Sequence, residues 1–355
     1  MQLNRALALA VLVLGAGARA DDIVTSKVQV YVDNDHTTVV TPMVQASADV
    51  AAGTTITAGY LVDAVTSASI DTVTQASPTT IHDTRHQVTV GASQELDPIT
   101  VRAGYVFSIE NDYLSHTFSG GATKDLFDKN TTLALDLALS ANTVGRAGDY
   151  NFERTLDVGT LSASWTQVID ERTIAQLAYE LADASGYQAS PYRFVPVRAT
   201  LASAPELWVA ETDPDTRWRH ALVLSANRAV GDASAIQGDY RIYHDTWGIT
   251  SSTIGARYLV RLSRALELRL RERFYTQNAA SFYLDNYTTP QRYMTYDREL
   301  SPLWSETFGV KLDYLITPKL DIELKLDGFY YHYTDFPPLD WRIGCNVGTG
   351  VTLTY

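Results

Sequence analysis

The stretch KLDIELKLDGFYYHY, residues 319–333, decides the fold because its two faces differ in kind. Its even-numbered residues from Leu320 to Leu326 are aliphatic, and its odd-numbered residues from Asp321 to Asp327 are charged. Successive side chains of a β-strand point to opposite faces, so this period of two predicts a strand with one apolar and one wet face. The stretches ALELRLRERF (265–274) and TTLALDLAL (131–139) repeat the pattern.

Sixteen stretches with this alternation, separated by turn residues, fill the chain after residue 20. Two of them, 112–125 and 154–168, alternate poorly, so their register is uncertain from sequence. The predicted strands are 23–33, 38–50, 54–66, 84–96, 99–110, 112–125, 131–144, 154–168, 172–184, 217–230, 233–246, 248–263, 266–278, 300–316, 319–333 and 341–355.

The connections between these strands are sorted by length. Every second junction is a tight turn, near 51–53, 97–98, 127–130, 170–171, 231–232, 264–265 and 317–318. The other junctions include all the long ones, near 67–83, 145–153, 185–216, 279–299 and 334–340. Outer-membrane barrels have short periplasmic turns and longer external loops. We therefore expect an all-β, transmembrane, antiparallel up-and-down β-barrel of about sixteen strands, with its long loops outside.

The two ends of the chain agree with export to the bacterial outer membrane. Residues 1–20 have a positive start, an apolar run and a small-residue cleavage site, which is typical of a signal peptide. We expect residues 21–355 to form one barrel domain, which ends on the aromatic Tyr355. The apolar run is too short to span a bilayer, and no other stretch reaches eighteen apolar residues, so no transmembrane helix is expected. A soluble secreted protein remains the alternative.

The net charge and the cysteine content exclude some kinds of partner and some ways of stabilising the fold. The formal net charge is −13, and it becomes −15 once Arg5 and Arg19 leave with the signal peptide. This acidic balance argues against a nucleic-acid partner. It fits solubility, loops filled with cations, or a cation-preferring lumen. Cys345 is the only cysteine, so the exported chain has no internal disulfide and must be held by its strand ladder.

Charged residues at predicted lumen positions fall into a basic and an acidic set on neighbouring strands. The two sets could create a field across a pore that orders polar solutes, or they could pair with each other across adjacent strands and have a structural role only. The basic set is Arg257, Arg261, Arg269, Arg271 and Arg273, and the acidic set is Asp313, Asp321, Glu323 and Asp327.

The connection 185–216 is the one long enough to fold into the bore. It could constrict a pore, or it could form an external lid or binding loop, and the sequence leaves both open. Its candidate residues are Tyr192, Arg193, Arg198, Glu206, Trp208 and Glu211.

Catalytic and metal-binding signals are weak. His244 beside Asp245, and His332 near Asp335, could each activate water at the rim of the barrel, but no serine, histidine and aspartate set accompanies them. The sequence offers no phosphate-binding glycine loop and no CxxC motif, so we expect no catalytic residues, no metal site and no cofactor.

Several stretches resemble a family of uncharacterised, predicted outer-membrane proteins of Gram-negative bacteria, classed only as a domain of unknown function. They cover most of the chain after residue 20. The resemblance implies a signal-bearing, porin-like barrel and brings no catalytic set. The stretches are GYLVDAVTSASID (59–71), ENDYLSHTFSGGATKDLFDKNTTL (110–133), YRFVPV (192–197), DPDTRWRHAL (213–222), DYRIYHDTWGITSSTI (239–254) and RERFYTQNAASFY (271–283).

The function expected from the sequence is a passive or weakly selective channel for small polar solutes. The alternatives are a non-conducting barrel whose external loops bind a partner or surface ligand, and a hydrolase located at the rim. The expected partners are outer-membrane lipid, the barrel-assembly machinery that inserts such proteins, and the solutes themselves. An oligomer is possible.

Overall fold

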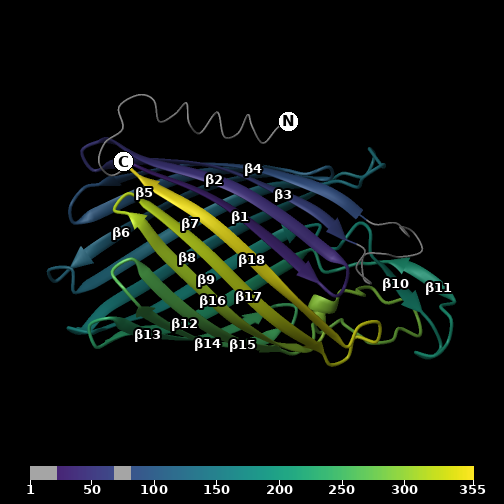
Figure 1. The fold of residues 1–355 in the computed structure, drawn as a ribbon. Helices are drawn as coiled ribbons and strands as arrows, with labels where there is room; N and C mark the ends of the chain where they lie inside the picture. The colour runs from purple at the N-terminus through teal and green to yellow at the C-terminus, as the bar shows by residue number, and fades with distance from the viewer. Residues whose placement is uncertain (1–21, 68–80) are drawn as a thin grey trace.

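The computed structural model describes residues 22–67 and 81–355, which form a closed barrel of sixteen antiparallel strands (Figure 1). Each strand pairs with the next along the chain, except that β9 pairs with β12 across an inserted hairpin. The first and last strands close the barrel through eleven residue pairs, from Ile23 with Thr354 to Asp33 with Gly344. The predicted fold class is therefore confirmed. The predicted signal peptide and residues 68–80 lie outside the described residues.

All sixteen predicted strands are present, and their ends lie within three residues of the predicted ones. The structure adds the two short strands of the hairpin and one 3₁₀ turn. The strands are β1 (Ile23–Asp33), β2 (Thr37–Ala51), β3 (Thr54–Ser67), β4 (Ile81–Glu95), β5 (Ile99–Ile109), β6 (Tyr113–Leu126), β7 (Thr131–Val144), β8 (Arg154–Asp170), β9 (Thr173–Gly186), β10 (Phe194–Val197), β11 (Leu207–Ala210), β12 (Thr216–Val230), β13 (Ser234–Asp245), β14 (Thr250–Arg261), β15 (Leu266–Gln277), β16 (Leu303–Thr317), β17 (Leu320–Tyr333) and β18 (Trp341–Thr354), and the 3₁₀ turn is η1 (Arg298–Leu300).

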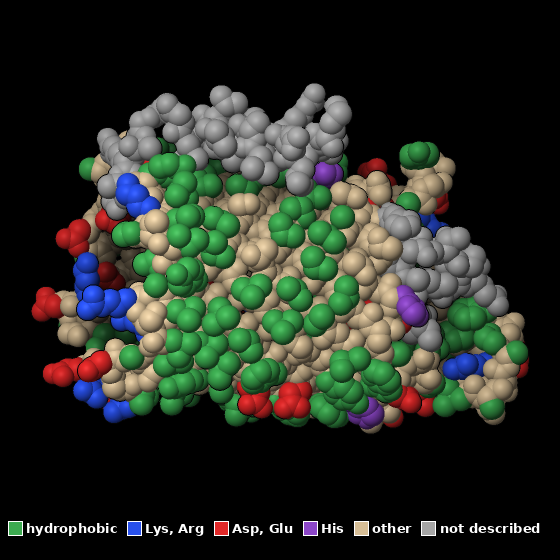
Figure 2. All heavy atoms as spheres, in the orientation of Figure 1, with side chains coloured by type: hydrophobic (Ala, Val, Ile, Leu, Met, Phe, Trp, Pro, Cys, Tyr) green, Lys and Arg blue, Asp and Glu red, His purple; other side chains and the backbone are tan. Residues whose placement is uncertain are grey.

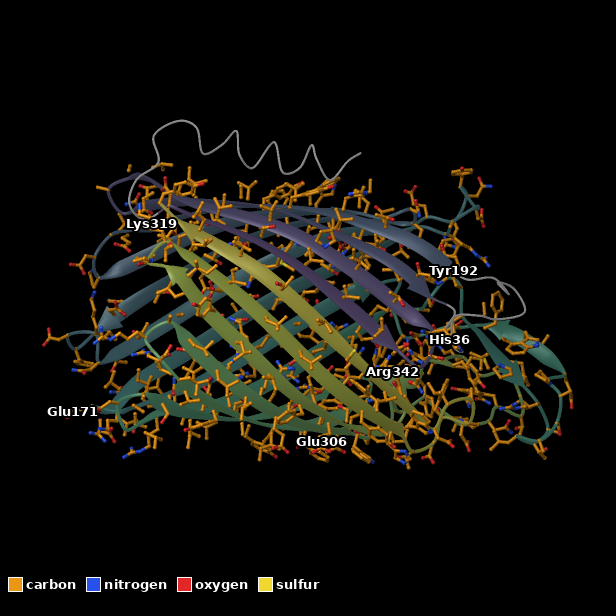
Figure 3. The ribbon with its side chains drawn as sticks, viewed as in Figure 1. His36, Glu171, Tyr192, Glu306, Lys319 and Arg342 are labelled. Atoms are coloured by element: carbon orange, nitrogen blue, oxygen red, sulfur yellow. The ribbon has the colours of Figure 1, made fainter. Side chains whose placement is uncertain are left out.

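The short turns gather at one end of the barrel and the long connections at the other. Figure 3 shows Glu171 and Lys319 at the short-turn end, and His36 and Tyr192 at the long-loop end. Gly53 and Gly231 turn the chain at the short-turn end with φ of 68° and 70°, a conformation that side chains with a Cβ rarely adopt. The sorting of connections expected from the sequence is thus present in the structure.

The aliphatic residues of the strands point outward. Leu133, Leu135, Leu137 and Leu139 of β7 are 43–55% exposed, although a soluble protein would bury such a row. Figure 2 shows hydrophobic and uncharged side chains over the middle of the barrel, with charged groups gathered toward its two ends. Glu306 is an exception, on the outer surface of β16 (Figure 3). This outward apolar band is what a barrel presents to lipid.

The buried hydrophobic clusters of the described residues lie at the long-loop end. One joins strand ends to loops, around Trp247, Leu300, Tyr333 and Phe336. The other, around Val195, Tyr287 and Met294, joins the inserted hairpin to the connection between β15 and η1. The long connections are therefore packed against each other. Within the described ranges, no helix has the length and hydropathy needed to cross a bilayer.

Candidate functional site

The inward face of β14 to β17 carries both predicted charge sets. Directly opposed residues of antiparallel strands share a face, and the register pairs Arg257 with Arg271, and Gly309 with both Arg271 and Asp327. The remaining members keep the same odd-numbered parity as these residues. Arg261 and Asp321 lie at the short-turn end of the set, whereas Arg273 lies nearest the long loops.

Ion pairs connect the acidic set mainly to lysines. The structure brings the arginines and carboxylates together directly at one position, where Arg271 lies 3.5 Å from Asp327. The lysine pairs are Lys311 with Asp313 at 2.6 Å, Lys311 with Glu323 at 3.0 Å, Lys27 with Glu323 at 2.8 Å, and Lys325 with Asp327 at 2.8 Å. Ion pairs within a strand, to the next strand and across one intervening strand thus account for most of the acidic set and for little of the basic set.

Small residues line another part of the inward face, on strands β3 to β8. They border a cavity of about 390 Å³, which also contacts Arg102 and Asp136. Arg102 and Asp136 form an ion pair at 2.6 Å. Because glycine, alanine and serine side chains project little, this wall leaves space inside the barrel. The small residues at this cavity include Gly91, Ser93, Gly104, Ser119, Gly121, Ala138 and Ser162.

The hairpin of β10 and β11 lies beyond the barrel at the long-loop end (Figure 1). Two residues at its base hold it to the rest of the chain. The Tyr192 hydroxyl donates to Asp112 and accepts from the Ala147 amide at 2.6 Å. Arg193 contacts Glu211 at 3.0 Å and Asp297 at 3.1 Å.

The other candidate residues of this connection are spread over the hairpin. Arg198 donates from Nε to Asn286 at 3.1 Å, which joins the hairpin to the connection before η1. Trp208 pairs with Pro196 within the hairpin, and Glu206 is exposed. The constriction or lid role of the six residues stays a prediction.

Glu211 is the most enclosed of them, with a side chain that is 0% exposed. Its Oε1 accepts from Thr295 Oγ1 at 2.5 Å and from the Tyr296 amide at 3.3 Å, and its Oε2 accepts from the Ser190 amide at 2.9 Å besides Arg193. A buried carboxylate is tolerated only when it is fully hydrogen-bonded and paired. Glu211 therefore fixes the base of the hairpin to the connection that leads into η1.

The segment that lines the bore at this end is η1 and its flanks, which sequence reasoning missed. Gln277 holds it by donating to the carbonyls of Glu299 and Ser301, both at 2.8 Å. Asp297 begins the turn by accepting from the Glu299 amide at 2.9 Å. Asp297, Glu299 and Leu300 border a cavity of about 290 Å³ against wall residues that include Arg217, Arg241, Tyr243 and Tyr275. Residues 297–300 show no periodicity, and only Leu300 belongs to a predicted strand, as its first residue, so no signal in the sequence indicates an inward contact here.

Asp213 lies beside this segment with an unusual electrostatic environment. Its Oδ1 is buried with no hydrogen-bond partner, and it borders a cavity of about 170 Å³ together with Arg219, Trp247 and Asp297. Burial, followed by the nearby Glu211 and Asp297 carboxylates, raises the pKa of Asp213 to about 8. The carboxyl is therefore mostly neutral at pH 7.

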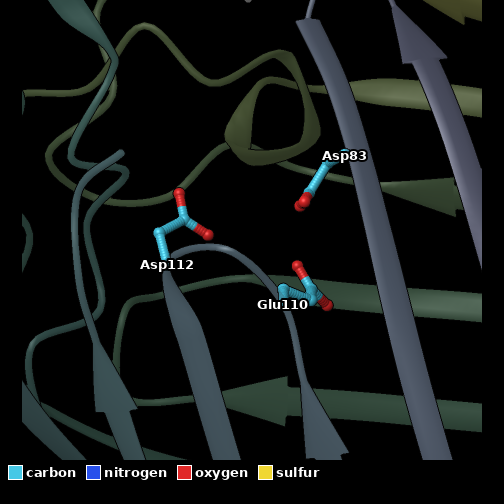
Figure 4. A group of neighbouring side chains, drawn as sticks. All are labelled: Asp83, Glu110 and Asp112. Carbon is cyan, nitrogen blue, oxygen red and sulfur yellow. The ribbon is translucent and has the colours of Figure 1, made fainter. Parts of the chain in front are cut away.

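Three carboxylates meet at the junctions of β4, β5 and β6. Asp83, Glu110 and Asp112 place one oxygen each within 4.8 Å of one another (Figure 4). Burial, hydrogen bonding to Asp83 and the charge of Asp83 raise the pKa of Glu110 to about 7. Oxygen-only groupings of this kind are the type that holds a hard divalent cation. The sequence did not reveal this group because Asp83 lies on β4, whereas Glu110 and Asp112 lie in the turn between β5 and β6. The expectation of no metal site stays a prediction.

The two histidine–carboxylate pairs considered for catalysis are not assembled. His244 contacts Thr250 Oγ1 at 3.0 Å on the outward face. Asp245 is 1% exposed on the inward side, where it accepts from Arg217 and from the Ile249 amide. His332 packs on Trp304, with ring centroids 5.7 Å apart. Neighbours in sequence thus point to opposite sides of the wall, which removes the geometric basis for a dyad of His244 and Asp245.

A closed barrel with an outward apolar band, a charged and small-residue interior, and packed loops at one end defines an outer-membrane β-barrel protein. Solved structures share the fold. A "Bacterial polysaccharide outer membrane secretin" aligns with a TM-score of 0.56 at 9% identity, over 96% of this chain and 100% of that one. CdiB from Acinetobacter baumannii aligns with a TM-score of 0.53 at 7% identity, over 94% of this chain and 61% of its own.

The family follows from sequence comparison. The profile of DUF3570, described as a protein of unknown function, matches residues 71–337. This match covers most of the chain, so the protein belongs to the DUF3570 family. No curated protein matches it in sequence. The chain is therefore a bacterial outer-membrane barrel of the family that its sequence resembled.

Proposed function

We propose that this protein is a water-filled channel through which small polar solutes cross the outer membrane. The observation that carries the proposal is the inward wall of small residues, which leaves a cavity of about 390 Å³ beside charged groups. A wall built only for stability would fill this space with large side chains, because packed interiors leave few voids. Sixteen-stranded barrels are also wide enough to leave an aqueous bore.

A channel also needs a defined entrance, and the packed loops at the long-loop end would form it. The η1 segment borders the cavity at the long-loop end, and the hairpin is held outside it by Glu211 and Arg193. Solutes would pass Arg217, Arg241 and Asp297 before they reach the wider part of the bore. The channel is expected to be weakly selective, since both signs of charge face this entrance.

Conductance across a planar bilayer tests the proposal. Refolded protein should give discrete open-channel steps. A variant in which residues 298–300 are replaced by Gly-Ser-Gly should give larger steps, because Leu300 no longer anchors the segment inward. Protein that inserts into the bilayer and gives no steps, with or without this replacement, would refute the channel.

The cavity at the long-loop end also favours a second candidate, a barrel that binds a ligand there without conducting. Tyr243, Tyr275 and Gln277 offer ring faces and hydrogen-bonding groups in about 290 Å³, a size that suits a small ligand. This candidate predicts saturable ligand protection of the tyrosines from chemical modification in protein that gives no conductance. Protection that is absent over a panel of small polar compounds would count against it.

A further inference from the structure

Apart from Arg217, which pairs with Asp245 at 2.5 Å, the inward-facing arginines of β12 to β15 differ from the other charged groups of the bore in having few carboxylate partners. Among the described residues, no carboxylate lies within the 4.0 Å ion-pair distance of Arg219, Arg241, Arg269 or Arg273. Two further arginines have weak partners, since Arg257 is 3.8 Å from Asp239, and Arg271 shares Asp327 with Lys325. The acidic residues of β16 and β17, in contrast, are mostly neutralised by lysines. The unbalanced charge inside this part of the wall is positive.

The register arranges these arginines as a ladder along the bore. Arg241, Arg273, Arg271 and Arg269 occupy four successive inward rows, from the long-loop end toward the short turns. Arg257 lies directly opposite Arg271 in its row. Like charges directly opposite each other destabilise a sheet. An ion-paired scaffold therefore does not explain the ladder, whereas a ligand that carries negative charge does.

Arg241, the residue of the ladder nearest the long loops, has free space in front of it. Arg241 borders a cavity of about 160 Å³ whose other side is made of Ser162, Ser164 and Ala178. Two carboxylates border the same cavity, but Asp136 is paired with Arg102, and Glu180 lies beyond ion-pair distance of Arg241. The Arg273 guanidinium lies 5.5 Å over the Tyr275 ring, so its N–H edge remains able to donate.

We propose that this arginine ladder binds oxyanions, so that the bore prefers anionic solutes that carry carboxylate or phosphate groups. The inference rests on the proposed channel and names its substrate class. Guanidinium groups suit such solutes because their N–H donors match two oxygens at once. Four successive rows provide a series of binding sites along the bore. An anion can move from one site to the next without binding tightly at any of them. The selectivity is opposite to the one that the acidic net charge of the chain suggests.

The zero-current potential of single channels in a KCl gradient tests the ladder. The wild type should prefer chloride. Replacing Arg241, Arg269 and Arg273 together by Gln should lower the chloride-to-potassium permeability ratio by about fivefold while open-channel steps persist, because fixed charges in a cleft raise counter-ion concentration by roughly tenfold or more. Arg228→Gln is the matched control, since Arg228 is 59% exposed and paired with Asp170 at the short-turn end. Its ratio should not change.

The outcomes separate the two proposals. Open channels that prefer potassium, or a triple variant with an unchanged ratio, would overturn the ladder and leave the channel standing. Protein without conductance overturns the channel, and the ladder is then tested by ³¹P line broadening of inorganic phosphate with detergent-solubilised protein. Broadening that the triple variant loses and Arg228→Gln keeps supports oxyanion binding, and equal broadening in all three refutes it. Repeating the potential measurement with phosphate and with citrate distinguishes phosphate-bearing from carboxylate-bearing solutes.

Discussion

Asp213→Asn should remove a pH-dependent loss of local stability from the packed loops at the long-loop end. Asp213 has a buried Oδ1 without a partner and two carboxylates nearby, and its pKa is raised to about 8. An asparagine has nearly the same shape and stays neutral at every pH. The substitution therefore separates the cost of ionising this group from all its packing contacts.

The size and sign follow from linkage. An Asp in the unfolded loop titrates near its ordinary pKa, here 3.8. The raised pKa of about 8 therefore corresponds to an order of magnitude of roughly 6 kcal/mol, at about 1.4 kcal/mol per pKa unit. Because the pKa of the folded state is the higher one, the stabilisation is complete below about pH 4. It decreases as the pH rises and is fully lost above about pH 8. The packed hairpin should therefore open more often in alkaline buffer.

Hydrogen exchange followed by mass spectrometry measures this opening in residues 187–215. Wild-type protein should lose protection between pH 6 and pH 9 after correction for intrinsic exchange, and Asp213→Asn should not. Asp215→Asn is the control, because Asp215 lies in the same turn with an exposed side chain. Equal pH dependence in the wild type and Asp213→Asn would refute the assigned cause.

Three further substitutions test the wall and the loops. Leu137 is an outward residue that is 47% exposed. Leu137→Arg should reduce the free energy of unfolding in lipid vesicles by about 2–4 kcal/mol. An effect no larger than that of Leu137→Ala would contradict a lipid-facing position. Glu211→Gln breaks the buried pair with Arg193 and should cost the hairpin about 3–5 kcal/mol of local stability by hydrogen exchange, with the exposed Glu206→Gln unaffected. Gly309→Val places a Cβ 2.1 Å from Asp327 Oδ1 and should destabilise the barrel by about 1–3 kcal/mol in urea titrations, so an unchanged midpoint would show that Asp327 moves freely.

The parts of the fold that sequence predicts well are those where the two faces of a strand differ strongly. β7 is predicted with its observed bounds because leucines face out and Thr, Asp or Ala face in. β6 alternates poorly for a physical reason that the structure supplies. Its inward residues, such as Ser119 and Gly121, must be small to leave space, so their hydropathy contrasts little with outward Gly120 and Ala122. The part of the small-residue wall that β6 contributes is therefore hard to see in the sequence.

The site was less predictable because it depends on register between strands. The sequence placed the arginines and carboxylates on neighbouring strands, but one-residue differences in pairing decide which of them meet. Lys311 and Lys325, which neutralise most of the acidic set, were not singled out because a lysine on a strand carries no signal of its partner. The inward segment at residues 297–300 is fixed by hydrogen bonds to Gln277, more than twenty residues earlier. Such long-range contacts have no local pattern.

The seam between β1 and β18 has a consequence for how the molecule is made. Its eleven pairs join residues more than 300 positions apart. The synthesis of the chain is therefore almost finished before β1 can pair with β18. Until then two rows of unsatisfied amides and carbonyls stay open to any neighbouring chain. β1 and β18 are therefore the two strands whose edges need protection until the barrel closes.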